Sequence, residues 1–346
     1  NDLVDYIEEN RLLKSDAVPS DPGYASQWAL PAIKIPEAWD ISKGSDSVLV
    51  AVIDSGIYRS HPDFVGVDIR GGVDYVLGGP CNRDATGHGT NVTGIIGAKT
   101  DNGVGVAGVN WDVAIVPLGI IWSNGYAYSD DLIAAIYDAA NMGCKVINLS
   151  LGGNFFSDSE SAAISYAVAK GCIVVAAAGN SGESNYNYPA SYDGVISVAS
   201  VDSSLNRSSF SQYNDQVDVA APGENIYSTA YQYKTQGKDY IYNNGTSFSA
   251  PYVSGIAALA AALEPSITYD EFYDALIGSC TDRGAAGYDY YYGHGLIDAE
   301  KLLMRIVNTL SYNITAEAAS PRAGTVTGAG TFAYGIEITV TAQAEA

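Results

Sequence analysis

The sequence predicts an α/β fold with three αβα layers around a mostly parallel central sheet. Between about residues 47 and 262, apolar runs typical of strands alternate with stretches typical of helices. The strand-like runs are continuously hydrophobic, which indicates strands that are buried on both faces. Repetition of strand, helix and strand in this form builds a parallel sheet that helices cover on both sides.

The expected elements follow one another along the chain. The strand-like runs are VLVAVID (48–54), VAIVPLG (113–119), KVINLSLGG (145–153), IVVAAAGN (173–180), VISVASVD (195–202) and VDVAAPG (217–223). Helices are expected near 88–97, in SDDLIAAIYDAANMG, in SESAAISYAVAKG and over 247–263. Functional sites gather where parallel strands end at their carboxyl ends, so Asp54 and Asn180, which close two of these runs, are candidate site residues.

Composition restricts the partners of this chain. It has 346 residues, 47% of them hydrophobic, and a net charge of −22. Such an acidic surface is repelled by nucleic acid and by anionic membranes, so neither is an expected partner. We find no run of 18 or more purely apolar residues and therefore expect no membrane span. The chain begins without Met or a signal-peptide pattern, so we expect a trimmed product.

The four cysteines are Cys81, Cys144, Cys172 and Cys280, and none is in a C-x-x-C pair. This spacing argues against a zinc site and against a disulfide-rich scaffold. Cys144 and Cys172 each open a strand-like run, where we favour a free buried thiol over a disulfide.

One of the three histidines is a candidate catalytic base. His88 lies in T-G-H-G-T, and its glycine neighbours allow backbone and substrate to approach closely. His61, in the turn sequence S-H-P-D, and His294, in Y-Y-G-H-G-L, are interpreted as structural. Asp54 follows a fully apolar strand, where a carboxylate is costly without a partner. An imidazole base needs such a carboxylate to hold its tautomer, so the two are predicted to pair.

The stretch G-T-S-F-S-A-P (245–251) places hydroxyl groups at the start of an apolar helix. Ser247 would be displayed at a tight turn, with backbone N–H groups and the positive helix end directed at a developing oxyanion. Pro251 falls in the first helical turn, where a missing N–H costs little. Taken alone, Ser247 would be interpreted as a helix N-cap. Together with Asp54 and His88, it is interpreted as a nucleophile, in a chain order that differs from that of chymotrypsin.

Seven blocks of the chain together resemble the signature blocks of the subtilisin-like serine proteases, the subtilases. They are V-I-D-S-G-I, G-H-G-T, N-L-S-L-G-G, A-A-A-G-N, V-D-V-A-A-P-G, G-T-S-F-S-A-P and Y-G-H-G-L-I-D-A, in the family's order over about residues 20–305. The resemblance implies a subtilisin-like fold and a serine endopeptidase that works through an acyl-enzyme.

The resemblance also implies a role for each candidate catalytic residue. Ser247 would be the nucleophile, His88 the base and then the acid, and Asp54 the group that orients His88. Asn180 would donate its side-chain amide to the oxyanion beside the N–H of Ser247, and Ser249 would be a helix residue.

The same resemblance implies the substrate pockets. Strand residues Ser150, Leu151 and Gly152, with Ala178 and Gly179, would form the walls of the primary pocket, and Asn187 would lie near its floor. Tyr128 and Leu151 would border a second, apolar pocket. Asn187 and Ser181 are uncharged, which argues against a strict demand for Lys or Arg beside the cut bond. We therefore expect broad or apolar-preferring specificity.

The stretch T-D-N-G-V-G-V-A-G (100–108) resembles the calcium loop of the family. The side chain of Asn102 and the carbonyls of Thr100, Val104 and Val106 would bind the ion, and Asp21 and Asp63 would complete the site. Calcium takes six to eight oxygen ligands, carboxylates among them. Without the resemblance, a plain surface loop would be the favoured interpretation.

The ends of the chain are interpreted as appendages to a catalytic domain over 20–306. Residues 1–19 resemble the end of an inhibitory propeptide and its linker, with maturation cleavage expected between Leu13 and Val18. The propeptide would be an intramolecular inhibitor. Residues 307–346 are expected to be a β-rich extension and the start of a truncated further module.

One departure from the family pattern is Phe248, because Met often follows the catalytic serine. Since an aromatic ring resists peroxide, oxidation should spare the activity. The resemblance implies a secreted or cell-surface protein that acts on proteins or peptides. Three alternatives stay open: a dedicated precursor-processing protease, a catalytically silent binding scaffold, and a surface protein whose activity resides in missing modules.

Overall fold

A parallel β-sheet of eight strands forms the centre of the molecule in a computed structural model, which describes residues 18–315, 325–333, 336 and 338–343. The expected propeptide segment, apart from residues 18 and 19, therefore lies outside the described residues. The strands are β1 (Gly44–Asp54), β2 (Asp68–Ile69), β3 (Val73–Asp74), β4 (Asp112–Gly119), β5 (Val146–Leu149), β6 (Ile173–Ala177), β7 (Val195–Val201) and β8 (Val219–Pro222). Their order is β2-β4-β1-β5-β6-β7-β8, with β3 also paired to β4, and every pair is parallel.

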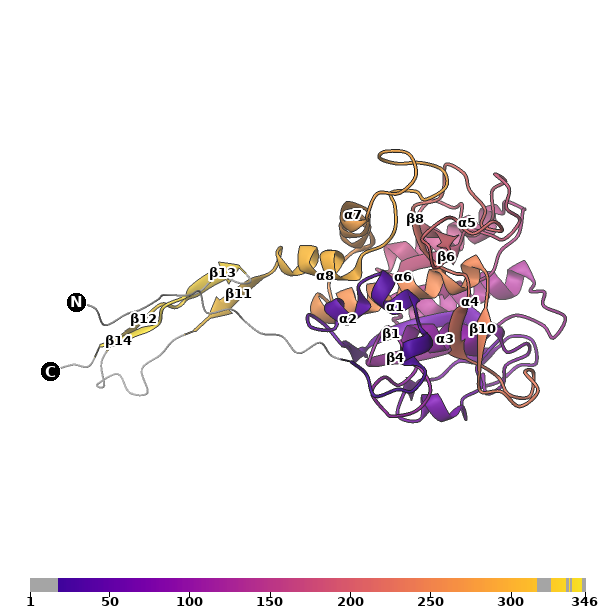
Figure 1. Ribbon diagram of the computed structural model, residues 1–346, viewed down its shortest axis with the longest axis horizontal. Coiled ribbons are helices and arrows are strands. Elements are labelled where there is room, and N and C mark those ends of the chain that lie inside the picture. Colours follow the sequence, from indigo (N-terminus) through magenta and orange to yellow (C-terminus); the bar gives the residue numbers. More distant parts are fainter. Residues whose placement is uncertain (1–17, 316–324, 334–335, 337, 344–346) are drawn as a thin grey trace.

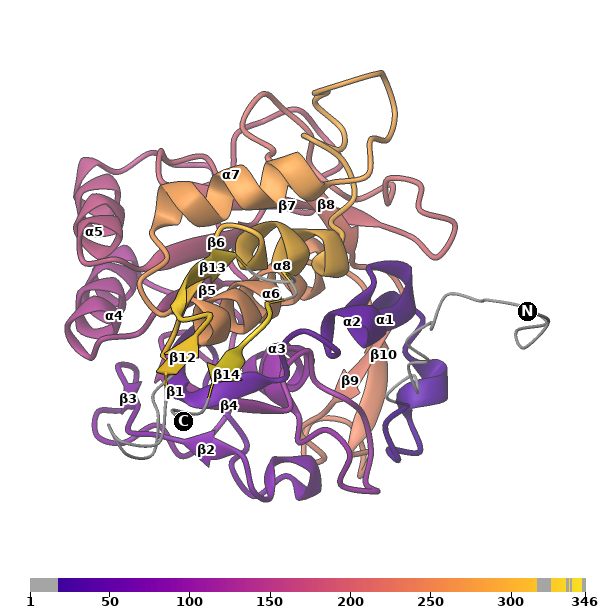
Figure 2. The same cartoon turned by 90° about the vertical axis from the view of Figure 1, so that its left-hand side faces the viewer.

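Helices cover both faces of this sheet (Figures 1 and 2). The α-helices are α1 (Ala29–Ala32), α2 (Ile35–Ala38), α3 (His88–Gly97), α4 (Ser129–Asn141), α5 (Asp158–Ala169), α6 (Ala250–Leu263), α7 (Tyr269–Ser279) and α8 (Ala299–Val307). Single 3-10 turns are η1 (Tyr24–Ser26), η2 (Pro62–Phe64) and η3 (Thr246–Phe248). Helices α4 and α5 pack on one face, and the other α-helices pack on the opposite face. The predicted three-layer fold is confirmed.

Strand β1 shows why its sequence is apolar without alternation. Val50 and Val52 belong to the core on the α6 side, while Ala51 and Ile53 belong to the core on the α4 side. All four side chains are at most 1% exposed. Both faces of the strand are therefore buried, as the continuous run VLVAVI predicts.

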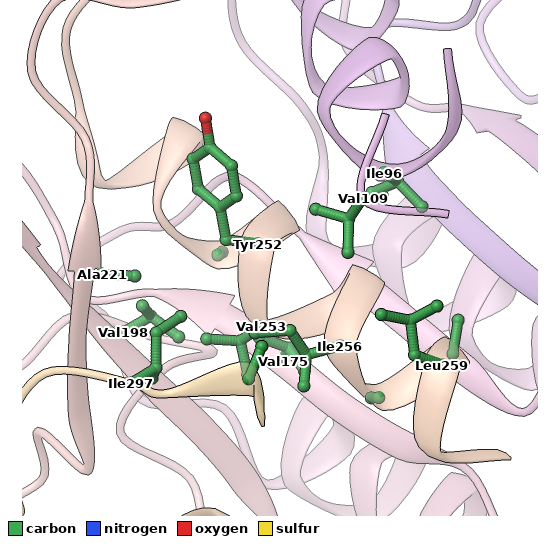
Figure 3. Packing of buried hydrophobic residues seen from close by; sticks show 14 of the residues in the cluster. Ile96, Val109, Val175, Val198, Ala221, Tyr252, Val253, Ile256, Leu259 and Ile297 are labelled. Atoms are coloured by element: carbon green, nitrogen blue, oxygen red, sulfur yellow. The ribbon is translucent and has the colours of Figure 1, made fainter. Parts of the chain in front are cut away.

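Helix α6 is buried along almost its whole length. Val253, Ile256 and Leu259 pack among side chains of the sheet and of the residue 96–109 region (Figure 3). A Cβ placed on Gly255 would lie 2.7 Å from Cβ of Val109, so only glycine permits this close approach. By length and composition the stretch Thr246–Leu263 could span a membrane, although it is not a purely apolar run. In the folded protein, 83% of this stretch is buried. Core helices of soluble proteins pass this test too.

Two antiparallel regions lie outside the parallel sheet. Strands β9 (Ile226–Thr229) and β10 (Tyr240–Asn243) form a hairpin that the sequence did not predict. Beyond α8, β11 (Ser311–Ile314) pairs with β13 (Gly330–Ala333), and β12 (Thr325–Thr327) pairs with β14 (Thr341–Gln343). These C-terminal strands extend away from the main body (Figure 1), in keeping with the expected β-rich extension.

All four cysteines are free thiols. Cys144 and Cys172 are 2% and 1% exposed, and Sγ of Cys172 donates to the carbonyl of Cys144 at 3.1 Å. Burial raises the pKa of Cys172 to about 11, so this thiol stays protonated at neutral pH. The preference for free buried thiols over a disulfide is confirmed.

Candidate active site

Asp54 and His88 are in direct contact where β1 ends and α3 begins. Asp54 is fully buried, and its Oδ1 and Oδ2 lie 2.8 and 2.9 Å from Nδ1 of His88. The backbone N–H of Ser55 also donates to Oδ1, at 2.6 Å. His88 is the first residue of α3 and follows Gly87, whose φ of 94° favours glycine. The buried carboxylate has the partner that its position required.

The environment of His88 favours the protonated ring. Burial of the ring lowers its pKa, but the negative charge and hydrogen bond of Asp54 raise it more, so the pKa of His88 is above 6.5. With Nδ1–H donating to Asp54, the other ring nitrogen, Nε2, is the one free to act as a base. His88 lines a cleft of about 1020 Å³, so this side chain faces open space.

A second buried carboxylate, Asp84, shapes the loop that leads into His88. It accepts hydrogen bonds from the backbone N–H groups of Gly87 and Thr90, at 2.7 and 2.8 Å, and from the hydroxyl of Ser55 at 2.6 Å. Sequence reasoning missed this role. An acidic residue just before a predicted helix is an N-cap signal and could have indicated it.

Ser247 is presented by η3, immediately before α6. Its Oγ donates to the carbonyl of Ser150 at 3.1 Å, and Oγ of Ser150 donates back to the carbonyl of Ser247 at 2.8 Å. The ring of the next residue, Phe248, packs on the ring of His88 at 5.4 Å between centroids, so this turn lies beside the base. Ser249 is buried at the N-cap of α6 and donates to the carbonyl of Ala221 at 3.1 Å.

Asn180 is held beside Ser247 by Thr246. Its Oδ1 accepts hydrogen bonds from the backbone N–H and the hydroxyl of Thr246, at 2.8 and 3.0 Å. Because oxygen accepts both, the Nδ2 amide group is left to donate elsewhere. Asn180 itself is exposed, so a substrate can reach this group.

The residues expected around the primary pocket lie together. A Cβ added to Gly152 would lie 2.3 Å from Nδ2 of Asn187, and one added to Gly179 would lie 3.1 Å from Cγ of Asn187. Asn187 is 6% exposed and donates to the carbonyl of Ala177 at 3.1 Å. Gln212, which was not predicted, also packs against Gly179. Asn187 and Gln212 thus fill the space where these two glycines approach.

These wall residues are loop residues, which corrects the expectation that they lie on strands. Strand β5 ends at Leu149 and β6 at Ala177, so Ser150–Gly152 and Ala178–Gly179 follow the strand ends. The apolar sequence runs continue beyond the last paired strand residues because these loops are partly buried as well. Ala178, for example, is 2% exposed.

A cleft of about 1020 Å³ runs from His88 along Ser150, Leu151 and Gly152. Its lining also includes Ile121, Tyr126, Tyr128, Leu132, Phe155, Glu160 and Tyr188. The expected border residues Tyr128 and Leu151 are both present. The cleft is not purely apolar, because the carboxylate residue Glu160 belongs to its lining.

The loop expected to bind calcium brings Asp21 and Asp63 together. Asp21 accepts the N–H groups of Asp101 and Asn102 at 2.7 and 3.3 Å, and Asp63 accepts Nδ2 of Asn102 and the N–H of Val106 at 3.1 and 2.8 Å. Both carboxylates are at least 96% buried. Burial raises the pKa of Asp63 to about 6, and the nearby charge of Asp21 adds to this effect.

This donor set fits a hard cation. The described residues contain no cluster of three or more His, Cys, Asp or Glu side chains, so the other ligands would be amide and carbonyl oxygens. Thr100, Val104 and Val106 are in the same loop and have such carbonyls. Neither carboxylate forms an ion pair with a described Lys or Arg. Two adjacent buried carboxylates without a counter-ion are what a calcium ion would neutralise.

The two remaining histidines have structural contacts. His61 is fully buried, its Nδ1 accepts the N–H of Asp63 at 3.0 Å, and its Nε2 lies 2.8 Å from the carbonyl of Asp239. The ring of His294 packs on that of Tyr288, at 5.1 Å between centroids.

Comparison with known proteins places this geometry in a family. The model of the Subtilase family matches residues 45–295. Thermitase from Thermoactinomyces vulgaris is 39% identical over 284 residues, which cover 82% of this chain and 98% of thermitase. Among solved structures, a protease from Pseudoalteromonas arctica aligns with a TM-score of 0.75 and 31% identity, over 83% of this chain and 99% of that one. A lanthipeptide protease aligns with a TM-score of 0.74 and 26% identity, over 85% and 100%. The chain therefore belongs to the subtilase family and is a subtilisin-like serine endopeptidase.

Proposed function

We propose that the chain cleaves peptide bonds through an acyl-enzyme on Ser247, with His88 as base and acid and Asp54 as its orienting group. The observation that carries this proposal is the two-oxygen contact of a fully buried Asp54 with Nδ1 of His88. That contact fixes the tautomer that leaves Nε2 free to take a proton, and it stabilises the imidazolium that forms.

The first half of the reaction forms the acyl-enzyme. Ser247 rotates from its bond with Ser150 toward His88, loses its proton to Nε2, and attacks the substrate carbonyl carbon. The negative oxygen that results accepts hydrogen bonds from Nδ2 of Asn180 and the N–H of Ser247. His88 then gives its proton to the departing amine, and the C–N bond breaks.

The second half releases the product. His88 takes a proton from water, and the hydroxide attacks the acyl carbon. A second oxyanion forms at the same donors and collapses, with the proton returning to Oγ of Ser247. The free enzyme is restored because each proton that His88 accepts is given back.

We also propose a preference for small or apolar uncharged side chains next to the cut bond. Asn187 packs against Gly152 and Gly179, Gln212 packs against Gly179, and neither carries the negative charge that a Lys or Arg side chain would pair with. Asn187 is already bonded to the carbonyl of Ala177. A large residue would have to displace these buried amides and break that bond.

The loop of residues 100–106 is proposed to hold a structural calcium ion with Asp21 and Asp63. When bound, the ion would supply positive charge to the two buried carboxylates and tie residues 21–23 to the loop. Gly23 already donates to the carbonyl of Gly105 at 2.6 Å. We further propose action outside the cell, with residues 1–19 as the remnant of an inhibitory segment, 20–306 as the catalytic domain and 307–346 as an extension. Family membership supports action outside the cell, and the family match over residues 45–295 lies within the proposed catalytic domain.

A dedicated precursor-processing role is the second candidate function. One similar structure is a lanthipeptide protease, and it aligns over 85% of this chain. A processing enzyme and a broad degrader share the same chemistry, so cleavage profiling on a peptide library separates them: a narrow motif indicates processing.

The test of the chemistry is labelling with a fluorophosphonate, followed by intact mass and peptide mapping. We expect one adduct, on Ser247, in the unaltered protein and in the control variant Ser249→Ala. Ser249 is a suitable control because its hydroxyl donates to the carbonyl of Ala221. Ser247→Ala should abolish the adduct, and Asp54→Asn should slow its formation strongly. Folded protein that takes no adduct after removal of residues 1–19, or an adduct elsewhere, would identify a silent scaffold instead.

A further inference from the structure

Glu160 is the one acidic side chain among the residues that line the cleft, and no Lys or Arg lines it. Glu160 is the third residue of α5 and is 8% exposed. A carboxylate this deeply buried is unusual unless it has a partner, because desolvation penalises the charge. The hydrogen bonds of Glu160 therefore show whether the side chain serves to stabilise the fold.

The ordinary purpose of a Glu at this helix position is a capping box, and Glu160 does not form one. Helix α7 shows the complete motif, in which Glu271 accepts the N–H of Thr268 at 2.8 Å. Helix α5 has the same S-x-x-E pattern, but the N–H of Ser157 donates to the hydroxyl of Tyr192 at 2.8 Å instead. Tyr192 thus takes over the capping contact, and the carboxylate of Glu160 is released from the helix end.

The carboxylate of Glu160 is only partly satisfied. Tyr192 donates its hydroxyl to Oε2 at 3.0 Å, while no described donor reaches Oε1. Oε1 is not among the described buried polar atoms that lack a partner, so it keeps contact with open space. No ion pair of the described residues includes Glu160, and burial raises the pKa of its carboxyl above 4.5. A cation seated at Oε1 would remove this penalty.

The surroundings of Glu160 suit a long basic side chain. Tyr126, Tyr128 and Tyr188 line the same cleft, and Tyr126 and Tyr128 are 75% and 65% exposed. The ring of Tyr188 packs on that of Tyr192, the partner of Glu160, at 4.7 Å between centroids. Aromatic faces pack on the methylene stem of Lys or Arg and attract its charge. The carboxylate then pairs with the cationic head through a charge-assisted hydrogen bond.

We propose that Glu160 makes the part of the cleft around it a binding site for a Lys or Arg side chain of the substrate. The inference rests on the proposed function, in which the substrate occupies the cleft that begins at His88. It assigns a charge preference to a position away from the cut bond, while the uncharged Asn187 keeps charge out of the primary pocket. The substrates are thus peptides with a basic residue at one fixed distance from the cleavage point.

The first experiment is cleavage profiling on a peptide library randomised on both sides of the cut. We expect Lys and Arg to exceed norleucine by about tenfold in kcat/KM at one position, the scale of one charged hydrogen bond. Glu160→Gln keeps the shape and an acceptor for Tyr192 but removes the charge, and should bring this ratio near one. Asp158→Asn removes a charge from the same helix turn outside the cleft and should leave the ratio intact. No basic preference, or one that Glu160→Gln retains, overturns the inference.

A binding measurement separates this inference from the proposed chemistry. In the Ser247→Ala background, fluorescence anisotropy compares a labelled peptide that carries Lys with one that carries norleucine at the selected position, or at each position in turn. Tighter binding of the Lys peptide that Glu160→Gln abolishes supports the site even where the enzyme hydrolyses nothing. Equal binding of the two peptides by a protein that does hydrolyse peptides rejects the site and leaves the chemistry standing.

Discussion

Asn180 and Thr246 are joined by two hydrogen bonds to one oxygen, which fixes the amide of Asn180 with Nδ2 turned away from Thr246. Thr246→Val removes one of these bonds and also the bond that the Thr246 hydroxyl accepts from the N–H of Gly179 at 3.1 Å. It should lower kcat about fivefold with little change in KM, because the lost bond to Asn180 orients the donor. Asn180→Ala should lower kcat by about 10²- to 10³-fold, the magnitude established for subtilisin itself. The control is Thr93→Val, since the hydroxyl of Thr93 has no partner within the described chain. Unchanged kcat in Thr246→Val would show that the backbone bond alone holds the amide.

The pH profile of kcat/KM should report the charge of His88. As the proposed base, His88 would work only when neutral, and Asp54 holds its pKa above the ordinary 6.5. Activity is therefore expected to be complete at high pH and to fall through an apparent pKa above 6.5 as the pH is lowered. In Asp54→Asn the acid limb should move to lower pH, and the rate should fall by about 10⁴-fold, as found for the triad aspartate of other serine proteases. A wild-type acid limb at or below 6.5 would argue against a charged Asp54 partner.

Hydrogen peroxide should leave the activity intact. Phe248 follows Ser247, the proposed nucleophile, with its ring on that of His88, and it has no sulfur to oxidise. The two methionines of the chain, Met142 and Met304, are 41% and 37% exposed and lie outside the cleft lining. Mass spectrometry should find both oxidised in fully active enzyme. Phe248→Met should become sensitive, and rapid inactivation of the wild type would refute the prediction.

Removal of calcium should lower the melting temperature. Saturation of a site at about 100 times its Kd adds about 2.7 kcal/mol, so a chelator should lower Tm by about 5 °C. Asp63→Asn should make Tm insensitive to chelator, because it removes a buried ligand. Asp101→Asn, in the same loop but outside the proposed ligand set, serves as the control and should keep the response. Equal Tm with and without chelator in the wild type would exclude a stabilising ion.

Asp218 should make stability fall as pH rises from about 4 to 6. Burial raises its pKa from 3.8 to about 6 in the folded protein, despite hydrogen bonds from Ser197 and Tyr273. Between about pH 4 and pH 6 the folded state therefore holds a proton on Asp218 that the unfolded state has lost. The free energy of unfolding falls with rising pH across this range and levels off above pH 6. The free energy of unfolding should fall by about 3 kcal/mol between pH 4 and pH 6. Urea unfolding at a series of pH values should show a smaller slope in Asp218→Asn, and an identical slope would contradict the assignment.

The contact between Asp54 and His88 was predictable because each residue has a local anomaly. A carboxylate that closes an apolar strand needs a partner, and a histidine between glycines has open space around it. The parallel sheet was predictable for a similar reason, since strands buried on both faces have no polar alternation. In each case the physical constraint acts within a few residues of sequence.

The other site features depend on distant segments. Glu160 looks like a helix cap in sequence, and only Tyr192, 32 residues away, takes that role from it. Gln212 meets Gly179 because β7 and its following loop return to the sheet end, and no spacing rule indicates this. The hairpin of β9 and β10 was missed because its strands have four residues each, too few to show a period.

Ser247 precedes α6 by three residues, and α6 is buried in the larger core along almost its whole length. The hydroxyl proposed as the nucleophile is thus anchored to a helix that loses its burial only when the core itself comes apart. We therefore expect the temperature at which hydrolysis stops to coincide with the temperature at which the whole molecule melts. Engineering for heat tolerance would then be scored directly by residual turnover, without a separate assay of structure.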